Sequence, residues 1–298
     1  MYKKMVVLLD GSELAEVVFD YAQELAGRMG VCVELLHVCS PREVSQLPMR
    51  RAYLEQRAKQ LHAEAQEISV RYSRQTTELC GETRGTVVVG YPAEEILNYV
   101  DENDIDLVMM STHGSSGVRA WGLGGVANKV VHASKVPVWL VPAELREEVI
   151  SDTLPRRVMV VPLSGSPQSA VALPHAVEIL AQRGAETDLV LLHLMDVFYS
   201  VAQRDALDRF EAKRAEMKKY LEGLAQPIRE SGLVVHTEVL VGDPARSIIE
   251  YLKGHPTQLL VMAARGRTRL DRMVFGSLAE SVLHMVKVTP LLLVSGEE

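Results

Sequence analysis

Short, largely apolar runs alternate along the chain with longer stretches in which apolar residues recur every three or four positions. Continuous apolar runs are typical of parallel strands that are buried on both faces of a sheet. In the first half of the chain they predict five strands, at Met5–Leu9, Val31–Val38, Thr86–Val89, Asp106–Met110 and Val136–Val141.

The stretches between these runs predict amphipathic helices, because their apolar residues fall on one face of a helix. With the strands they give each half five strands and four helices. The residues that mark the clearest helices are Leu14, Val17, Val18, Tyr21 and Leu25, then Leu54, Leu61, Ala65 and Ile68, and in the second half Phe210, Met217, Leu221 and Leu224.

The second half of the chain repeats the first at an offset of about 152 to 156 residues, which is the length of a domain. Leu35–Val38 corresponds to Leu191–Leu194, and Gly90–Ala93 corresponds to Gly242–Ala245. We therefore expect two related domains, residues 1–143 and 156–298, joined by a polar linker at 144–155.

Strands that alternate with helices imply parallel strands joined by right-handed crossovers. The predicted fold class is therefore α/β, with two tandem doubly wound five-stranded parallel sheets. Ligands of such sheets bind beyond the carboxyl ends of the strands, where the strand order reverses. The loops after the first, second and fourth strand of each half are thus the places to look for a site.

Composition and charge limit the kinds of molecule that we expect this protein to bind. The 298 residues carry a net charge of -7 and are 47% hydrophobic, which argues against general attraction to nucleic acid or to an anionic membrane. The chain shows no amino-terminal signal pattern and no apolar run of the roughly 18 residues that a membrane helix needs. We expect a cytoplasmic protein without nucleic-acid or membrane partners.

The three cysteines are Cys32, Cys39 and Cys80. They are odd in number and lack CxxC or mixed Cys/His spacing, so neither a disulfide framework nor a zinc site is predicted. Unpaired cysteines would suit a reducing cytoplasm.

Glycines after the fourth strand of each half precede a predicted helix. Gly114 is followed after nine residues by Gly124 and Gly125, and Gly266 is followed after nine residues by Gly276 and Ser277. Glycines allow a ligand to approach the backbone closely, and the amides at a helix amino terminus favour a phosphate. The alternative is that a tight loop alone requires these glycines.

With these motifs the chain resembles the universal stress protein family, which carries G-x2-G-x9-G-[ST] after the fourth strand and a D-x-S turn after the first. The resemblance covers nearly the whole chain, as a tandem, and implies the adenine nucleotide alpha hydrolase-like fold. It also implies that ATP or AMP binds, with or without Mg²⁺, and that domains pair through their last strands. Here that pairing would join the two halves as an intramolecular pseudo-twofold pair, with further self-association as a dimer.

Carried over from the family pattern, the nucleotide-binding residues are Asp10, Val38, Met110, His113, Gly114, Gly124, Gly125 and Val126 in the first half, and Pro162, Ser164, Leu194, Met262, Arg265, Gly266, Gly276, Ser277 and Leu278 in the second. The pattern is incomplete in both. The first glycine is replaced by Ser111 and Ala263, the loop hydroxyl by Gly125, and the aspartate of the second half by Ser164.

Other nucleotide and catalytic motifs fit poorly. Gly122–Ala127 matches a dinucleotide pattern, but it lies about ten residues beyond its strand and no acidic residue follows at the required distance. A Walker A loop and a G-x-S-x-G elbow are absent. His113 is expected to donate a hydrogen bond, and His37 and His193 are expected to be structural.

The sequence thus favours a stress-response regulator that binds an adenine nucleotide and changes its assembly or its contacts with an unknown protein partner. No catalytic residues are predicted, and at best weak ATPase activity is expected. Two alternatives stay open: a scaffold that binds no nucleotide, and a small-molecule hydrolase or transferase that uses the same clefts.

Overall fold

The computed structural model describes residues 2–72, 80–114, 123–142, 157–183, 187–196, 204–255, 257–264 and 275–295. The chain divides into two compact units, Met1–Leu145 and Arg146–Glu298, which we call the first and the second domain. The predicted linker at 144–155 lies outside the described residues, so its bounds stay a prediction.

The first domain contains a parallel sheet in the order β3-β2-β1-β4-β5. Because the order reverses on either side of β1, the sheet is doubly wound, as predicted. Its described strands are β1 (Lys4–Leu8), β2 (Cys32–Cys39), β3 (Arg84–Val89), β4 (Leu107–Ser111) and β5 (Val138–Val141).

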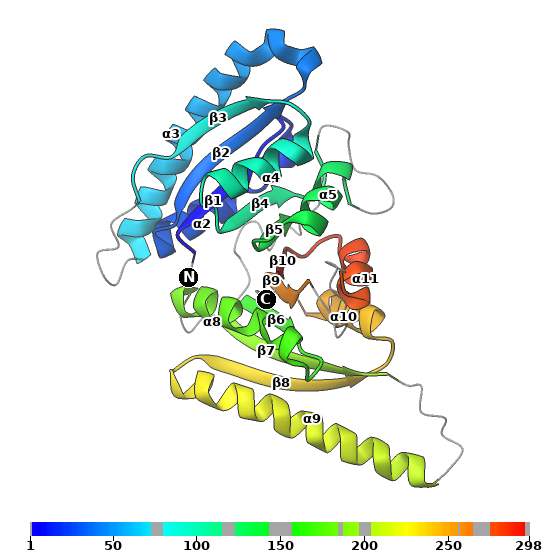
Figure 1. Cartoon of the computed structure of the whole chain (residues 1–298). Coiled ribbons are helices and arrows are strands. Elements are labelled where there is room, and N and C mark those ends of the chain that lie inside the picture. Colours follow the sequence, from blue (N-terminus) through cyan, green and yellow to red (C-terminus); the bar gives the residue numbers. More distant parts are fainter. Residues whose placement is uncertain are drawn as a thin grey trace. The chain divides into compact units, whose positions relative to one another are not determined.

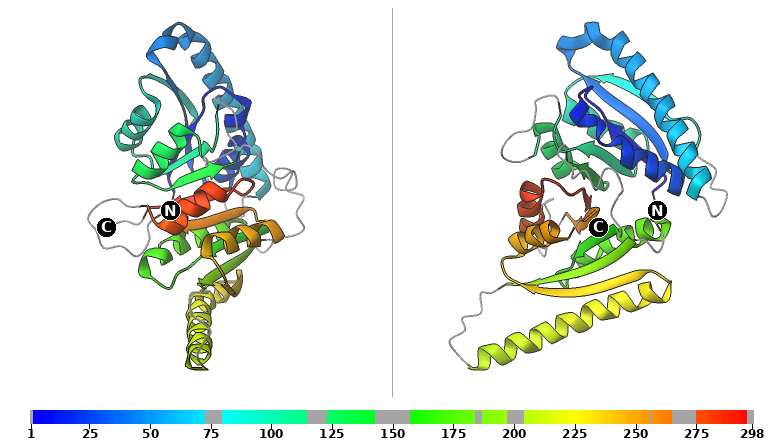
Figure 2. Two further views of the ribbon diagram at one scale, coloured as in Figure 1. Left: turned by 90° about the vertical axis from the view of Figure 1, so that its right-hand side faces the viewer. Right: turned by 180° about the vertical axis from the view of Figure 1, so that it is seen from behind.

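Helices cover both faces of this sheet. Figure 1 shows α4 and α5 in front of it, and the right-hand view of Figure 2 shows α2 and α3 on its reverse. The described helices are α1 (Glu13–Glu16), α2 (Phe19–Met29), the 3₁₀ helix η1 (Pro41–Gln46), α3 (Leu47–Tyr72), α4 (Pro92–Glu102) and α5 (Gly125–Ala133).

The first predicted helix is divided into α1 and α2. Val17 and Val18, which lie between them, keep right-handed helical dihedral angles, with φ of -59° and -72°. The apolar spacing that predicted a single helix therefore continues across the break.

The second domain repeats this architecture, with a parallel sheet in the order β8-β7-β6-β9-β10. Its long helix α9 lies along β8 in Figure 1 and in the right-hand view of Figure 2. Its described elements are β6 (Arg157–Pro162), α7 (Pro167–Ala170), α8 (Ala172–Arg183), β7 (Thr187–Met195), α9 (Arg204–Glu230), β8 (Val234–Val241), α10 (Pro244–Gly254), β9 (Leu259–Ala263), α11 (Ser277–Met285) and β10 (Leu291–Val294).

The same tight turn follows the first strand of each domain. Gly11 and Gly165 have φ of 82° and 83°, a conformation that only glycine adopts readily. The side chains of Ser12 and Ser166 then accept hydrogen bonds from Ala15 N and Ser169 N, which caps the helix that follows. This turn places the residue before each glycine at the carboxyl edge of the sheet.

The strands of both sheets form the cores. The central strand β1 is buried from Met5 onward, and among the described residues the largest side chain that is fully buried is Trp139 of β5. The described part of the chain has no helix that is both long enough and apolar enough to span a membrane.

Cys32 and Cys80 form a disulfide, with their Cα atoms 5.0 Å apart, so the prediction of unpaired cysteines is wrong. Cys32 begins β2 and Cys80 precedes β3, and these neighbouring parallel strands start at the same edge of the sheet. The two cysteines thus meet because their strands are neighbours in the sheet. The spacing of cysteines along the chain does not reveal which strands are neighbours. Only Cys39 stays a free thiol, and it is buried. The cysteine argument for a reducing compartment no longer holds, and cytoplasmic location stays a prediction.

Candidate functional site

A cavity of about 450 Å³ opens at the carboxyl edge of the first sheet. The segments after β1, β2 and β4 line it together with the first turns of α4 and α5. All eight residues that the sequence singled out in this domain lie on its wall: Asp10, Val38, Met110, His113, Gly114, Gly124, Gly125 and Val126.

Asp10 stands at the polar rim of this cavity. Its Oδ1 accepts hydrogen bonds from Ser12 N at 3.0 Å and from Ser12 Oγ at 2.6 Å. Its Oδ2 lies so close to Gly114 that a Cβ atom at that position would collide with it. The turn therefore fixes one oxygen of the carboxylate, and the glycine at position 114 leaves room for the other.

The amino terminus of α5 forms another part of the wall. Gly124 N donates a hydrogen bond to Thr112 O at 2.9 Å, which folds the end of the loop back onto β4. The residue at the helix cap is glycine, so it has no side chain to accept from the first-turn amides, and Gly125, Val126 and Ala127 face the cavity. Such amides, together with the helix dipole, attract an anion.

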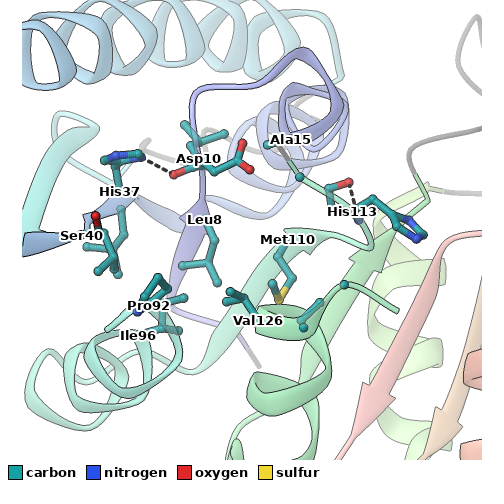
Figure 3. Close-up of a pocket in the computed structure, with 18 of the residues that line it drawn as sticks. Leu8, Asp10, Ala15, His37, Ser40, Pro92, Ile96, Met110, His113 and Val126 are labelled. Carbon is teal, nitrogen blue, oxygen red and sulfur yellow. Dashed lines mark hydrogen bonds between the residues drawn. The ribbon is translucent and has the colours of Figure 1, made fainter. Parts of the chain in front are cut away.

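His113 lies at the rim near the end of β4 (Figure 3). Its Nδ1 and Thr112 Oγ1 are 3.0 Å apart and share a hydrogen bond. This bond holds the imidazole ring at the mouth of the cavity.

Aliphatic and thioether side chains form the inner wall. Figure 3 shows Leu8, Met110 and Val126 side by side, with Pro92 and Ile96 of α4 next to them. A flat, largely apolar group would fit against this surface, since small-molecule sites combine apolar walls with a few placed polar groups.

His37 also lines this cavity, and its own contacts give it a structural part. It is 6% exposed, and its Nδ1 is 2.8 Å from Leu9 O. Burial lowers the pKa of His37, and the bond to Leu9 O opposes part of that effect. His193 makes the equivalent bond to Leu163 O at 2.7 Å in the second domain. The geometry agrees with the structural role expected for both histidines.

A cavity of about 490 Å³ occupies the corresponding place in the second domain. Arg265 and Gly266 lie outside the described residues. The other seven predicted residues of this domain line the cavity: Pro162, Ser164, Leu194, Met262, Gly276, Ser277 and Leu278.

The second cavity keeps the geometry of the first with different chemistry. Ser164 Oγ lies 2.9 Å from Ser166 Oγ, where the first domain has the Asp10 carboxylate and Ser12. Gly276 N donates to Ala264 O at 2.9 Å, and Ser277 begins α11 at the wall. The second cavity therefore lacks the acid but has a hydroxyl at the helix start.

Some residues that line the two cavities were not predicted from the sequence. They come from the long crossover helices α3 and α9 and from the segments after β2 and β7. In the first cavity these are Ser40, Glu43 and Arg50, and in the second they are Asp196, Lys213 and Met217. The amphipathic pattern of α3 and α9 indicated which face is buried, but it carried no sign that these helices reach the site.

Each cavity thus offers an apolar wall, a polar turn after the first strand and the amino terminus of a helix. This arrangement suits a ligand with a flat ring at one end and an anionic group at the other. In the described residues no group of three or more His, Cys, Asp or Glu side chains could hold a metal ion.

Comparison with known proteins finds the family that the sequence motifs resemble. The family model described as "Universal stress protein family" matches residues 1–142 and again residues 155–295. A universal stress protein of Mycolicibacterium smegmatis is 27% identical over 301 aligned positions, which cover 97% of this chain and 96% of that protein. One of Methanocaldococcus jannaschii is 30% identical over 126 residues, 42% of this chain and 74% of that protein.

A solved structure supports the fold over the full length. The crystal structure of a universal stress protein from Archaeoglobus fulgidus aligns with a TM-score of 0.68 at 20% identity, and it covers 99% of this chain and 97% of that one. The two family matches and this full-length likeness agree with the repeated sheet and the repeated cavity. The chain belongs to the universal stress protein family, with two of its domains in tandem.

Proposed function

We propose that this protein binds an adenine nucleotide, ATP or AMP, and acts as a stress-response regulator whose assembly or partner contacts depend on the bound nucleotide. The observation that carries this proposal is the convergence of all eight predicted residues of the first domain on one cavity. Elsewhere in the family, one solved universal stress protein is in complex with cAMP.

The parts of the first cavity match the parts of an adenine nucleotide. Asp10 supplies an acceptor for an amino group, and the apolar wall around Met110 suits a heteroaromatic ring. The amides at the start of α5 suit phosphate oxygens. The cavity lies within the volume range of about 300 to 1,000 Å³ that small-molecule sites usually have.

The two domains should differ in affinity for the base. Replacing the Asp10 carboxylate by the Ser164 hydroxyl exchanges a charge-assisted hydrogen bond, worth about 1.5 to 3 kcal/mol, for a neutral one. Having Gly125 in place of a loop hydroxyl costs the first domain about 1 kcal/mol, since the backbone amide is kept. We expect the first domain to hold the nucleoside better and the second to select for phosphates, with Arg265 as a further contact.

Binding rather than efficient catalysis is proposed. Any Mg²⁺ would be held chiefly by the nucleotide phosphates, because the described residues offer no cluster of metal-binding side chains. ATPase activity, where present, should be weak.

Assembly is the proposed output. In this proposal the two domains pair within one chain through their last strands, β5 and β10, and the protein self-associates further as a dimer. A cytoplasmic location accompanies this proposal.

The experiment is recovery of ligand from the full-length protein. The protein is incubated with ATP or AMP, freed of unbound nucleotide, and denatured, and the released small molecules are identified by mass spectrometry. Stoichiometric recovery of adenine nucleotide supports the proposal. Folded protein that repeatedly comes through without nucleotide supports the alternative, a scaffold that acts through protein contacts alone.

A further inference from the structure

The long crossover helices α3 and α9 can be aligned by their buried residues. Leu54, Ala58 and Leu61 are buried in α3, and Leu221, Ala225 and Ile228 are buried in α9 with the same spacing of four and three residues. Four residues before the leucine that begins each set stand Arg50 in α3 and Met217 in α9. The two residues therefore occupy the same position of the repeated fold.

The turn after the first strand confirms this equivalence independently. A Cβ atom at Gly11 would collide with Arg50 Nη1, and a Cβ atom at Gly165 would lie 3.4 Å from Met217 Sδ. Both side chains thus lie over the same turn, and both line the cavity of their domain. Arg50 Nη1 also lies 3.5 Å from Asp10 O.

The chemistry at this position changes together with the chemistry of the turn. The first domain has the Asp10 carboxylate and the Arg50 guanidinium at one turn, with the guanidinium over Gly11 and 3.5 Å from the backbone oxygen of Asp10, so a strong acceptor and a strong donor both face the cavity. The second domain pairs the Ser164 hydroxyl with the Met217 thioether, which is apolar and at most a weak acceptor. Two charged groups are therefore replaced by two neutral ones.

We propose that Arg50 is a specificity-determining residue of the first cavity, which binds the nucleoside end of the ligand beside Asp10, and that Met217 removes this recognition from the second cavity. This inference rests on the proposed nucleotide binding. The ligand class is a heteroaromatic ring with a donor and an acceptor side by side, as adenine presents with its amino group and ring N7.

Charge explains why Arg50 is assigned to the ring and not to a phosphate. A phosphate placed against the guanidinium would also stand close to the negatively charged Asp10, with which Arg50 shares the turn. The phosphate-binding geometry is supplied by another element, the amino terminus of α5. The neutral pair in the second domain offers only the Ser164 hydroxyl and apolar contact at the ring end, so we expect ligands there to be selected by their anionic end.

The test measures binding of adenosine, AMP and ATP to the full-length protein and to its Arg50→Met variant by calorimetry. Methionine is the residue that the second domain carries at this position. Because Arg50 contacts the nucleoside, which all three ligands share, we expect the variant to lose roughly 10- to 100-fold in affinity for each of them, by the same factor. Arg50→Lys should restore part of the loss.

Arg51→Met is the matched control, because Arg51 is the exposed neighbour on the same helix and does not line the cavity. It removes the same charge and should leave all three affinities unchanged. A loss in Arg50→Met that grows with the number of phosphates would overturn the inference, and so would unchanged binding in that variant. If the wild-type protein binds none of the three ligands, the proposed function itself fails, which is a different result.

Discussion

Asp10 combines two tasks in one side chain. One oxygen holds the turn through Ser12, and the other lies against Gly114 at the cavity. Removing the carboxylate should weaken nucleotide binding in the first domain by roughly 10- to 100-fold, the equivalent of about 1.5 to 3 kcal/mol for a hydrogen bond to a charged group. Calorimetric titration of Asp10→Ala with AMP measures this.

Asp101→Ala is the control for that experiment. Asp101 is an exposed acid of α4 that pairs with Lys135 at 2.8 Å and does not line the cavity. Exposed pairs of this kind contribute little to stability, so both binding and folding should be unchanged. Equal affinities in the two variants would mean that Asp10 serves only the turn.

His37 links the stability of the first domain to pH. Burial lowers its pKa from the usual value of 6.5, so the unfolded chain takes up a proton more readily than the folded one. The free energy of unfolding should therefore fall as pH drops through about 6.5 and level off below the folded-state pKa. Urea unfolding between about pH 7.5 and 5 measures this dependence.

The variant His37→Asn isolates this contribution, because asparagine does not titrate and can still donate to Leu9 O. We expect a shallower loss of stability with falling pH than in the wild-type protein. Identical slopes for the two proteins would show that His37 has an ordinary pKa in the folded state.

At the scale of elements, α2 and α3 pack so closely that one position must be glycine. A Cβ atom at Gly27 would lie 2.7 Å from both Ala65 O and Ile68 Cβ. Gly27→Ala should destabilise the first domain by about 1 to 3 kcal/mol, the usual cost of overpacking.

Gly223 of α9 is exposed and has open space around it, so Gly223→Ala should instead stabilise its domain by about 0.4 to 1 kcal/mol. Urea unfolding of both variants checks the contrast, and effects of the same sign would contradict the packing described.

The Cys32–Cys80 disulfide closes the crossover that contains α3. The two cysteines are 48 residues apart, and closing a loop of that length stabilises a fold by about 4 kcal/mol in the chain-entropy model. Reduction should therefore lower the melting temperature of the wild-type protein and expose two additional thiols. Cys32→Ser should melt at the lower temperature whether or not reductant is present. A melting temperature of the wild-type protein that reductant does not change would contradict a stabilising disulfide.

At the scale of the whole molecule, much of the fold follows from the order of apolar runs. Parallel strands joined by crossovers have their carboxyl ends at one edge, so the order of the runs alone indicates that Asp10, Val38 and His113, which lie at the carboxyl ends of three strands or just after them, come together. The duplication then predicted the second cavity from the first.

The features that escaped prediction depend on contacts between distant elements. Cys80 meets Cys32 only because β3 lies next to β2, and Arg50 reaches Gly11 only because η1 turns the chain back before α3 begins. Neither arrangement leaves a periodic or spacing signal along the chain. The alignment of the two long helices that brings out the position of Arg50 and Met217 uses their buried residues, which the structure identifies.

We propose that this tandem protein binds an adenine nucleotide in the cavity at the carboxyl edge of at least its first sheet. Calorimetric titration of the purified full-length protein with ATP tests it most directly. We expect saturable binding of at least one ATP per chain. The absence of saturable binding of either ATP or AMP up to millimolar concentration, in protein that circular dichroism shows to be folded, would contradict the claim.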